Sequence, residues 1–152
     1  LIETGQLPKE RLLLNMEDRW EEVQAASWRT YLRDHRTEAI AHCREKMRTG
    51  DADRRLSATL SFWHGRTVYG LWPSPTRREW VAFLVAHLDD PDFRVRRAVG
   101  RILLECLGTQ KPPQAQFRIP WPWEESPAPV QPGEPEALEE VRAAARKLLA
   151  QP

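Results

Sequence analysis

The fold is decided at residues 88–99, which read LDDPDFRVRRAV. Pro91 is not expected inside a helix, because it has no amide proton and its ring clashes with the preceding turn. The aspartates around it can accept hydrogen bonds from the free N–H groups at the start of a helix. On both sides of this stretch, apolar residues recur at steps of three and four, which is typical of helices. We therefore expect two helices that meet at this turn.

Each of these two expected helices has one apolar face. Before the turn it consists of Trp80, Phe83, Leu84, His87 and Leu88, and after the turn of Val95, Ala98, Val99, Ile102 and Cys106. Thr76 and Glu79 have the spacing of a capping box, which predicts the start of the first helix. Gly108 is expected to end the second helix.

Helical periodicity continues in the rest of the chain. One long helix from about Pro8 to Arg33 is predicted by Leu12, Met16, Trp20, Val23, Ser27 and Tyr31. Two shorter helices follow, with inward residues Ile40, Cys43 and Met47 in the first and Leu56, Leu60 and Trp63 in the second. Gly50 is expected to close the first in the left-handed conformation, and Asp51 or Asp53 to cap the second.

Two segments are expected not to form regular helices. Residues 65–75 contain Gly70, Pro73 and Pro75, which disfavour a helix. Residues 109–133 hold seven of the thirteen prolines and predict an extended, proline-rich insertion that is neither helix nor central strand. A last helix is expected over residues 134–150, with Leu138, Val141, Ala145, Leu148 and Leu149 on its inner face.

An internal repeat links three of these helices. Residues 95–103 and 141–149 both read Val-Arg-x-Ala-x-x-basic-aliphatic-Leu. A fainter copy lies forty residues before the first, where Arg54, Ala58 and Phe62 match Arg94, Ala98 and Ile102. A spacing of about 40–47 residues is typical of helical-pair repeats. On these residues the segment from Pro75 to Gly108 resembles a HEAT-like repeat, of the kind also found in phycobilisome-lyase-type repeat proteins.

The resemblance implies an all-α fold in which antiparallel helical pairs stack as a short HEAT-like α-solenoid. Stacked neighbours would complete one core, because a single helical pair cannot bury its own apolar face. Residues 1–152 would form a single domain, from which the insertion at 109–133 departs. The resemblance also implies that Arg96 pairs with a turn aspartate of a neighbouring repeat.

The charge and the apolar runs limit the classes of partner. The formal net charge is +1, but residues 29–101 carry fifteen basic and nine acidic residues, which permits an anionic partner. No apolar run approaches the ~20 residues that span a bilayer, and no signal-peptide pattern is present. We expect a cytoplasmic protein without membrane contact. Because the chain opens on Leu1 rather than Met, we expect a piece of a longer protein.

Motifs of known chemistry are absent from the sequence, which has no phosphate-binding loop, nucleophile elbow, Cys-x-x-Cys or His-Glu-x-x-His. The best metal-like set is His35, Glu38 and His42, beside Cys43, but it falls on the face that we expect to be solvated. Cys43 and Cys106 fall on inward faces, where cysteine usually acts as a small hydrophobic residue. We expect no metal, no cofactor and no enzymatic activity.

Two sets of residues are candidates for binding. Trp72, Trp121 and Trp123 lie beside prolines and could anchor another protein, or another domain of the parent chain. The alternative for Trp121 and Trp123 is that they pack back onto the helical body. Arg94, Arg97 and Arg101 lie on one helical face and could contact the phosphates of a nucleic acid. The alternative for these arginines is a solvated face with ion pairs to nearby aspartates and Glu105.

Overall fold

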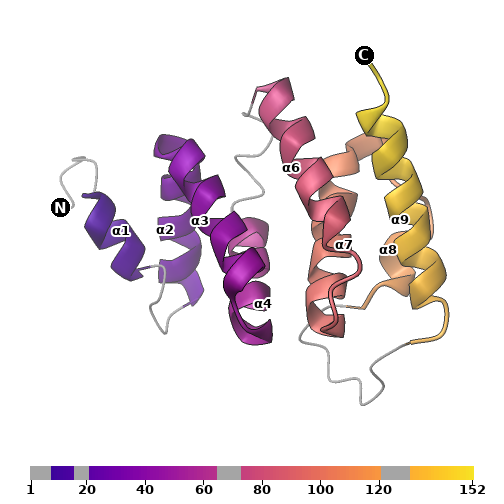
Figure 1. Cartoon of the computed structure of the whole chain (residues 1–152), viewed down its shortest axis with the longest axis horizontal. Coiled ribbons are helices and arrows are strands. Elements are labelled where there is room, and N and C mark those ends of the chain that lie inside the picture. The colour runs from indigo at the N-terminus through magenta and orange to yellow at the C-terminus, as the bar shows by residue number, and fades with distance from the viewer. Residues whose placement is uncertain (1–7, 16–20, 65–72, 121–130) are drawn as a thin grey trace.

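The computed structural model describes residues 8–15, 21–64, 73–120 and 131–152. Within these ranges the chain forms helices and no strand, which confirms the all-α prediction. The α-helices are α1 (Lys9–Asn15), α2 (Glu21–Asp34), α3 (Arg36–Thr49), α4 (Ala52–His64), α6 (Ser74–Ala86), α7 (Phe93–Leu107), α8 (Ala115–Arg118) and α9 (Glu134–Leu149), with a 3₁₀ turn, η1, at Gly108–Gln110. They follow one another in chain order along the long axis of the molecule (Figure 1).

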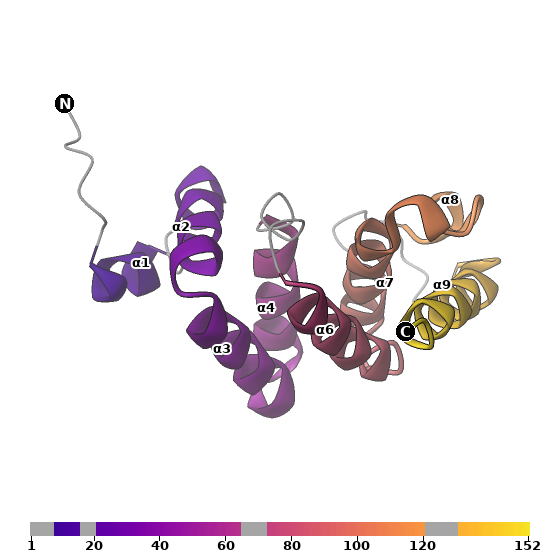
Figure 2. The ribbon, with the colours of Figure 1, turned by 90° about the horizontal axis from the view of Figure 1, so that it is seen from above.

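The helices between residues 36 and 107 pack in two pairs. Helix α3 packs on α4 across a two-residue connection, and α6 packs on α7 across residues 87–92. The two pairs contact each other through α4 and α7, and α9 packs against both α6 and α7 (Figure 2). One hydrophobic core runs through these contacts, from Leu12 in α1 to Ala145 in α9.

The turn at residues 88–99 has the predicted form. Asp92 is the N-cap of α7, and its Oδ1 accepts a hydrogen bond from the Arg94 amide at 2.8 Å. Gly108 ends α7 at a φ of +56°, in the region that favours glycine. The predicted inner face of α7 is buried except at Cys106, which is half-buried. The two-helix prediction is confirmed.

Asp90 joins this turn to the preceding helical pair. It accepts two hydrogen bonds from Arg55 of α4, from Nε at 2.8 Å and from Nη2 at 3.0 Å. Arg96, by contrast, donates to the backbone carbonyls of Asp90 and Pro91, in its own turn. The implied pairing of Arg96 with a turn aspartate of a neighbouring repeat is therefore wrong, because the Arg96 guanidinium is engaged by the backbone of its own turn.

In the second copy of the repeat, the implied pairing does occur. Arg142 occupies the position of Arg96 in the pattern shared by residues 95–103 and 141–149. Its Nη2 donates to Oδ1 of Asp89, in the turn before α7, at 2.7 Å. Arg142 thus connects α9 to the turn of the preceding helical pair.

The prediction of one helix over residues 8–33 is wrong. Helices α1 and α2 pack against each other, which two parts of one straight helix cannot do. An apolar residue at every third or fourth position fits two facing helices as well as one long helix. Leu12, Ser27 and Tyr31 are buried as expected, whereas Met16 and Trp20 lie outside the described residues.

The inner face of α4 also differs from the prediction. Leu56, Leu60 and Trp63 are only half-buried, whereas Ala58 and Phe62 are buried. The reason is that α2, α3 and α7 all contact α4, and they cover the side that carries Ala58 and Phe62. These two residues match Ala98 and Ile102 in the repeat, which was therefore the better guide to this face.

The ends of two helices depart from the predicted capping. Helix α6 begins at Ser74, before the expected capping box, because Pro75 fits the first turn of a helix. Gly50 ends α3 with an extended backbone (φ −73°) rather than a left-handed one. A Cβ at Gly50 would lie 2.5 Å from the carbonyl oxygen of Lys46, so glycine is required for space. Asp51 caps α4 as predicted, since its Oδ1 accepts from the Arg54 amide at 2.9 Å.

The proline-rich insertion is more ordered than predicted. Residues 109–120 include most of η1 and the single-turn helix α8, so the expectation of a wholly extended segment is wrong. Ala115 and Ile119 are fully buried. A Cβ added at Gly100 of α7 would lie 3.2 Å from the side chain of Ile119. The absent side chain at Gly100 lets this segment pack closely on α7. Residues 121–130 lie outside the described ranges.

Candidate functional site

The predicted aromatic anchors are not placed by the structure. Trp72, Trp121 and Trp123 all lie outside the described residues. Just before Trp121 and Trp123, Phe117 on α8 is 79% exposed, whereas Ile119 is buried against the helical body. The start of this segment therefore packs on the body, and the alternatives for the two tryptophans stay open.

The predicted arginine stripe on α7 is not an exposed surface at its centre. Arg97 has no accessible surface, and its Nη2 donates to Oε2 of Glu134 in α9 at 2.9 Å. Its guanidinium carbon also lies 4.6 Å from the ring centroid of Phe93. The expectation that Arg97 contacts a phosphate is wrong for this structure, because α9 and Glu134 cover its charge.

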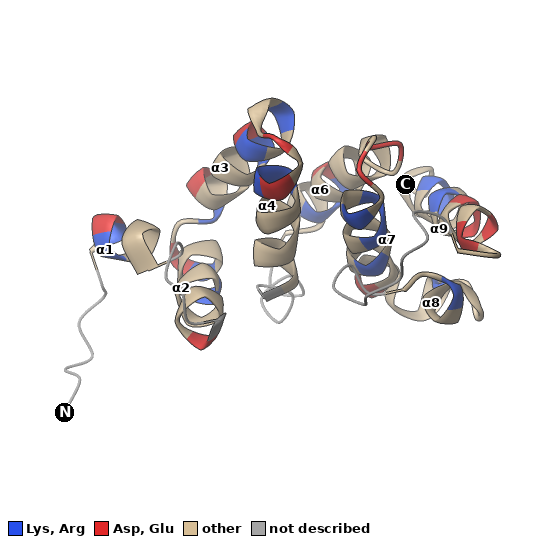
Figure 3. Cartoon of the chain, turned by 90° about the horizontal axis from the view of Figure 1, so that it is seen from below, with Lys and Arg blue, Asp and Glu red and all other residues tan. Residues whose placement is uncertain are grey.

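Arg94 is held by two carboxylates. Its Nη2 lies 2.9 Å from Asp53 of α4 and 2.9 Å from Asp92. The hydrogen bonds with Asp92 and Asp53 raise the pKa of Arg94 above its ordinary value. Arg101 is half-buried. Figure 3 shows the basic residues of α7 together with acidic residues on α4 and in the turn before α7. Arg94 and Arg97 thus hold α7 to its neighbours.

The metal-like set on α3 does not come together as ligands. His35 Nδ1 lies 3.4 Å from Glu38, but the ring of His42 packs on Trp28 with a centroid separation of 5.9 Å. Cys43 is buried, and burial raises the pKa of its thiol to about 12. Within the described ranges, no three histidine, cysteine or acidic side chains are grouped so that they could hold a metal ion.

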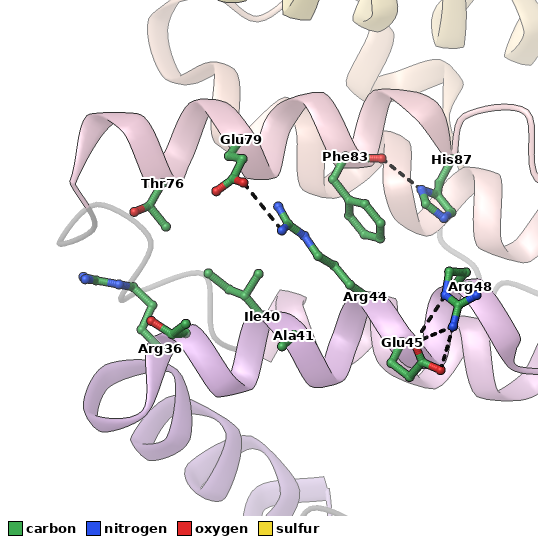
Figure 4. A pocket seen from close by; sticks show the side chains of 11 residues that line it. Arg36, Ile40, Ala41, Arg44, Glu45, Arg48, Thr76, Glu79, Phe83 and His87 are labelled. Carbon is green, nitrogen blue, oxygen red and sulfur yellow. Dashed lines mark hydrogen bonds and ion pairs between the residues drawn. The ribbon is translucent and has the colours of Figure 1, made fainter.

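A groove of about 800 Å³ lies between α3 and α6 (Figure 4). One wall is a stripe on α3 and the other is a stripe on α6. The residues that line it are Arg36, Thr37, Ile40, Ala41, Arg44, Glu45, Arg48, Thr76, Glu79, Phe83 and His87. Helices α3 and α6 pack on α4 and α7, respectively.

The groove has an aromatic surface on the α6 side. The Phe83 ring lies between Trp80, at a centroid distance of 5.2 Å, and His87, at 4.4 Å. His87 Nδ1 lies 2.9 Å from the carbonyl oxygen of Phe83, and Trp80 is stacked on Phe62 of α4 at 3.9 Å. Phe83 thus presents a half-buried ring to the groove that already packs on two aromatic neighbours.

The charges of the groove come mainly from α3. Arg44 reaches across to Glu79 of α6, with 3.7 Å between Nη1 and Oε1, and its guanidinium carbon lies 5.4 Å from the Phe83 centroid. Arg48 is held by two hydrogen bonds from its Nη2 to Glu45. Arg36 makes no ion pair with any residue that the structure describes. Three guanidinium groups thus face two carboxylates.

The sequence indicates which residues form each wall of the groove, but not that the two walls face each other. On α3, Arg36, Ile40, Arg44 and Arg48 recur at steps of four, and on α6, Thr76, Glu79, Phe83 and His87 recur at steps of three and four. Such spacing places each set on one helical face. Nothing in the spacing indicates that the two faces lie opposite each other, because this depends on how α4 packs on α7.

No family model matches the chain, and no curated protein or solved structure is significantly similar to it. None of the described helices combines the length and the apolar composition that crossing a membrane requires.

Proposed function

We propose that the chain is a HEAT-like module that binds another protein, or another domain of its parent chain, through the groove between α3 and α6. The role is binding rather than catalysis. The observation that carries this proposal is the groove itself, in which apolar side chains, among them Phe83 and Ile40, lie beside three arginines. Interfaces between proteins commonly combine an apolar centre with a polar rim, and aromatic residues and arginine are enriched in them.

The packing supports the HEAT-like part of the proposal. In an α-solenoid of antiparallel pairs, each pair is joined by a short turn and contacts mainly its neighbours. The connections at residues 50–51 and 87–92 are short, and α4 lies against α7. The aspartates of the second turn are bound from both sides, Asp90 by Arg55 and Asp89 by Arg142.

Nucleic-acid binding through α7 has less support than protein binding. A phosphate contact requires an arginine that can exchange water and counterions for the phosphate. Arg97 is buried against Glu134, and Arg94 is engaged by Asp53 and Asp92. The engaged arginines of α7 therefore support a nucleic-acid partner less than the groove supports a protein partner.

A matched pair of variants tests the proposal. Ala41 is exposed on α3 and lines the groove, so Ala41→Trp fills the groove without changing the core. Ala143→Trp makes the same change at an exposed position of α9. We expect proteins captured from a cell extract by the unmodified chain to be lost with Ala41→Trp and kept with Ala143→Trp, as measured by quantitative mass spectrometry. Equal retention by both variants would refute the groove as the binding surface.

A further inference from the structure

We infer that the groove between α3 and α6 binds an extended acidic peptide segment, with an apolar side chain of the segment against Phe83. The inference rests on the proposed function and adds the chemistry of the partner.

The length of the groove suits a short extended segment. Arg36 and Arg48 are twelve residues apart on α3, which corresponds to about 18 Å at 1.5 Å per residue. An extended chain advances about 3.3 Å per residue, so about five residues fill the groove.

The arginines of the groove favour carboxylates. The guanidinium of Arg44 lies over the Phe83 ring and makes a long 3.7 Å contact with Glu79, and its buried Nε has no hydrogen-bond partner among the described residues. Guanidinium groups bind carboxylates through two parallel hydrogen bonds, which are stronger than bonds between neutral groups. Arg36 borders the same groove near Thr76 (Figure 4). Arg36 and Arg44 therefore provide two positions for carboxylates, whereas Arg48 is neutralised by Glu45.

The position of Phe83 fixes the order of the side chains in the segment. Arg36 and Arg44 are eight residues apart on α3, about 12 Å, which an extended chain covers in about four residues. The guanidinium of Arg44 is 5.4 Å from the Phe83 centroid, close to the spacing of about 6.6 Å between residues i and i+2 of an extended chain. We expect two acidic residues three to four positions apart, with an apolar residue one or two positions beyond the second.

Selection from a random heptapeptide phage library tests the inference. Phage are selected on the unmodified chain after depletion on the Ala41→Trp variant, so that peptides bound elsewhere are removed. We expect the enriched peptides to carry two carboxylates and an apolar residue at the stated spacing. Their affinity, measured by fluorescence anisotropy, is expected to fall about tenfold or more with Arg44→Gln, as for the loss of a charge-assisted hydrogen bond.

Two controls separate the possible failures. Arg146→Gln makes the same charge change at an exposed position of α9 and is expected to leave the affinity nearly unchanged. Arg36→Gln, at the first residue of α3, provides a second groove variant, which replaces Arg44→Gln if circular dichroism shows that Arg44→Gln alters the fold. Enriched peptides that are basic or neutral, or that are insensitive to both groove variants, would overturn the acidic partner and leave the proposed function standing. If no peptide is enriched over Ala41→Trp, the acidic peptide is overturned as well, whereas the proposed function fails only if Ala41→Trp keeps the captured proteins that Ala143→Trp keeps.

Discussion

The ion pair between Arg97 and Glu134 allows a strong test of how α9 is held on α7. The two side chains are 0% and 2% exposed, and three hydrogen bonds of 2.9–3.2 Å join them. Glu134 Oε2 also accepts from the amide of Gln131 at 3.1 Å. Glu134→Gln keeps the shape of the side chain but leaves a guanidinium charge without a counter-charge and out of water. The expected loss in free energy of unfolding is about 3–5 kcal/mol.

A double variant and an exposed pair give this prediction its controls. Arg97→Met with Glu134→Leu removes both charges, so the double variant should be within about 2 kcal/mol of the unmodified chain, or more stable. Asp89→Asn breaks the pair with Arg142, in which the Asp89 side chain is 74% exposed, and should cost less than about 1 kcal/mol. Urea unfolding followed by circular dichroism at 222 nm measures all three. A cost for Glu134→Gln as small as that for Asp89→Asn would show that α9 does not cover Arg97.

Three further predictions follow from single residues. Gly50→Ala should lower the free energy of unfolding by about 1–3 kcal/mol, because its Cβ would press on the carbonyl oxygen of Lys46; an unchanged urea midpoint would show that the α3–α4 turn is looser than described. Asp90→Ala should cost about 2–5 kcal/mol in the same assay, because it leaves Arg55, which is largely buried, without its carboxylate; a cost below 1 kcal/mol would argue against the contact between α4 and α7. The raised pKa of Cys43 means that the folded chain keeps a thiol proton that the unfolded chain loses above about pH 9. The contribution of Cys43 to the free energy of unfolding is complete below pH 9 and falls by up to about 1.4 kcal/mol per pH unit as the pH rises towards 12. Between pH 8 and pH 10, the free energy of unfolding in urea should therefore fall less for Cys43→Ala than for the unmodified chain. Equal decreases for the two chains would contradict the burial of the thiol.

The parts of the fold that depend on neighbouring residues could be predicted from the sequence. The turn around Pro91, the cap at Asp92 and the end of α7 at Gly108 are each determined by the conformational limits of one or two residues. Helix α9 follows from its apolar periodicity in the same way. The internal repeat added longer-range information, since it identified Ala58 and Phe62 as residues of a buried face.

The parts that depend on packing could not be predicted. The stripe of arginines on α7 has the same spacing whether it faces water or another helix, and only the position of α9 decides that Arg97 is buried against Glu134. Likewise, the residues of the groove stand on two helices about forty residues apart. Their periodicity shows that each set shares a face, but the distance between Arg44 and Phe83 is a result of how the two helical pairs stack.

Site-specific photo-cross-linking tests the central claim most directly. Benzoylphenylalanine is incorporated in place of Ala41, inside the groove, and separately in place of Ala143, on the exposed face of α9. After irradiation in a cell extract, a protein or peptide partner should be covalently attached to the chain with the probe at position 41 and not to the chain with the probe at position 143. A partner that attaches at position 143, or that binds the chain without attaching at position 41, would contradict the assignment of the groove between α3 and α6 as the binding surface.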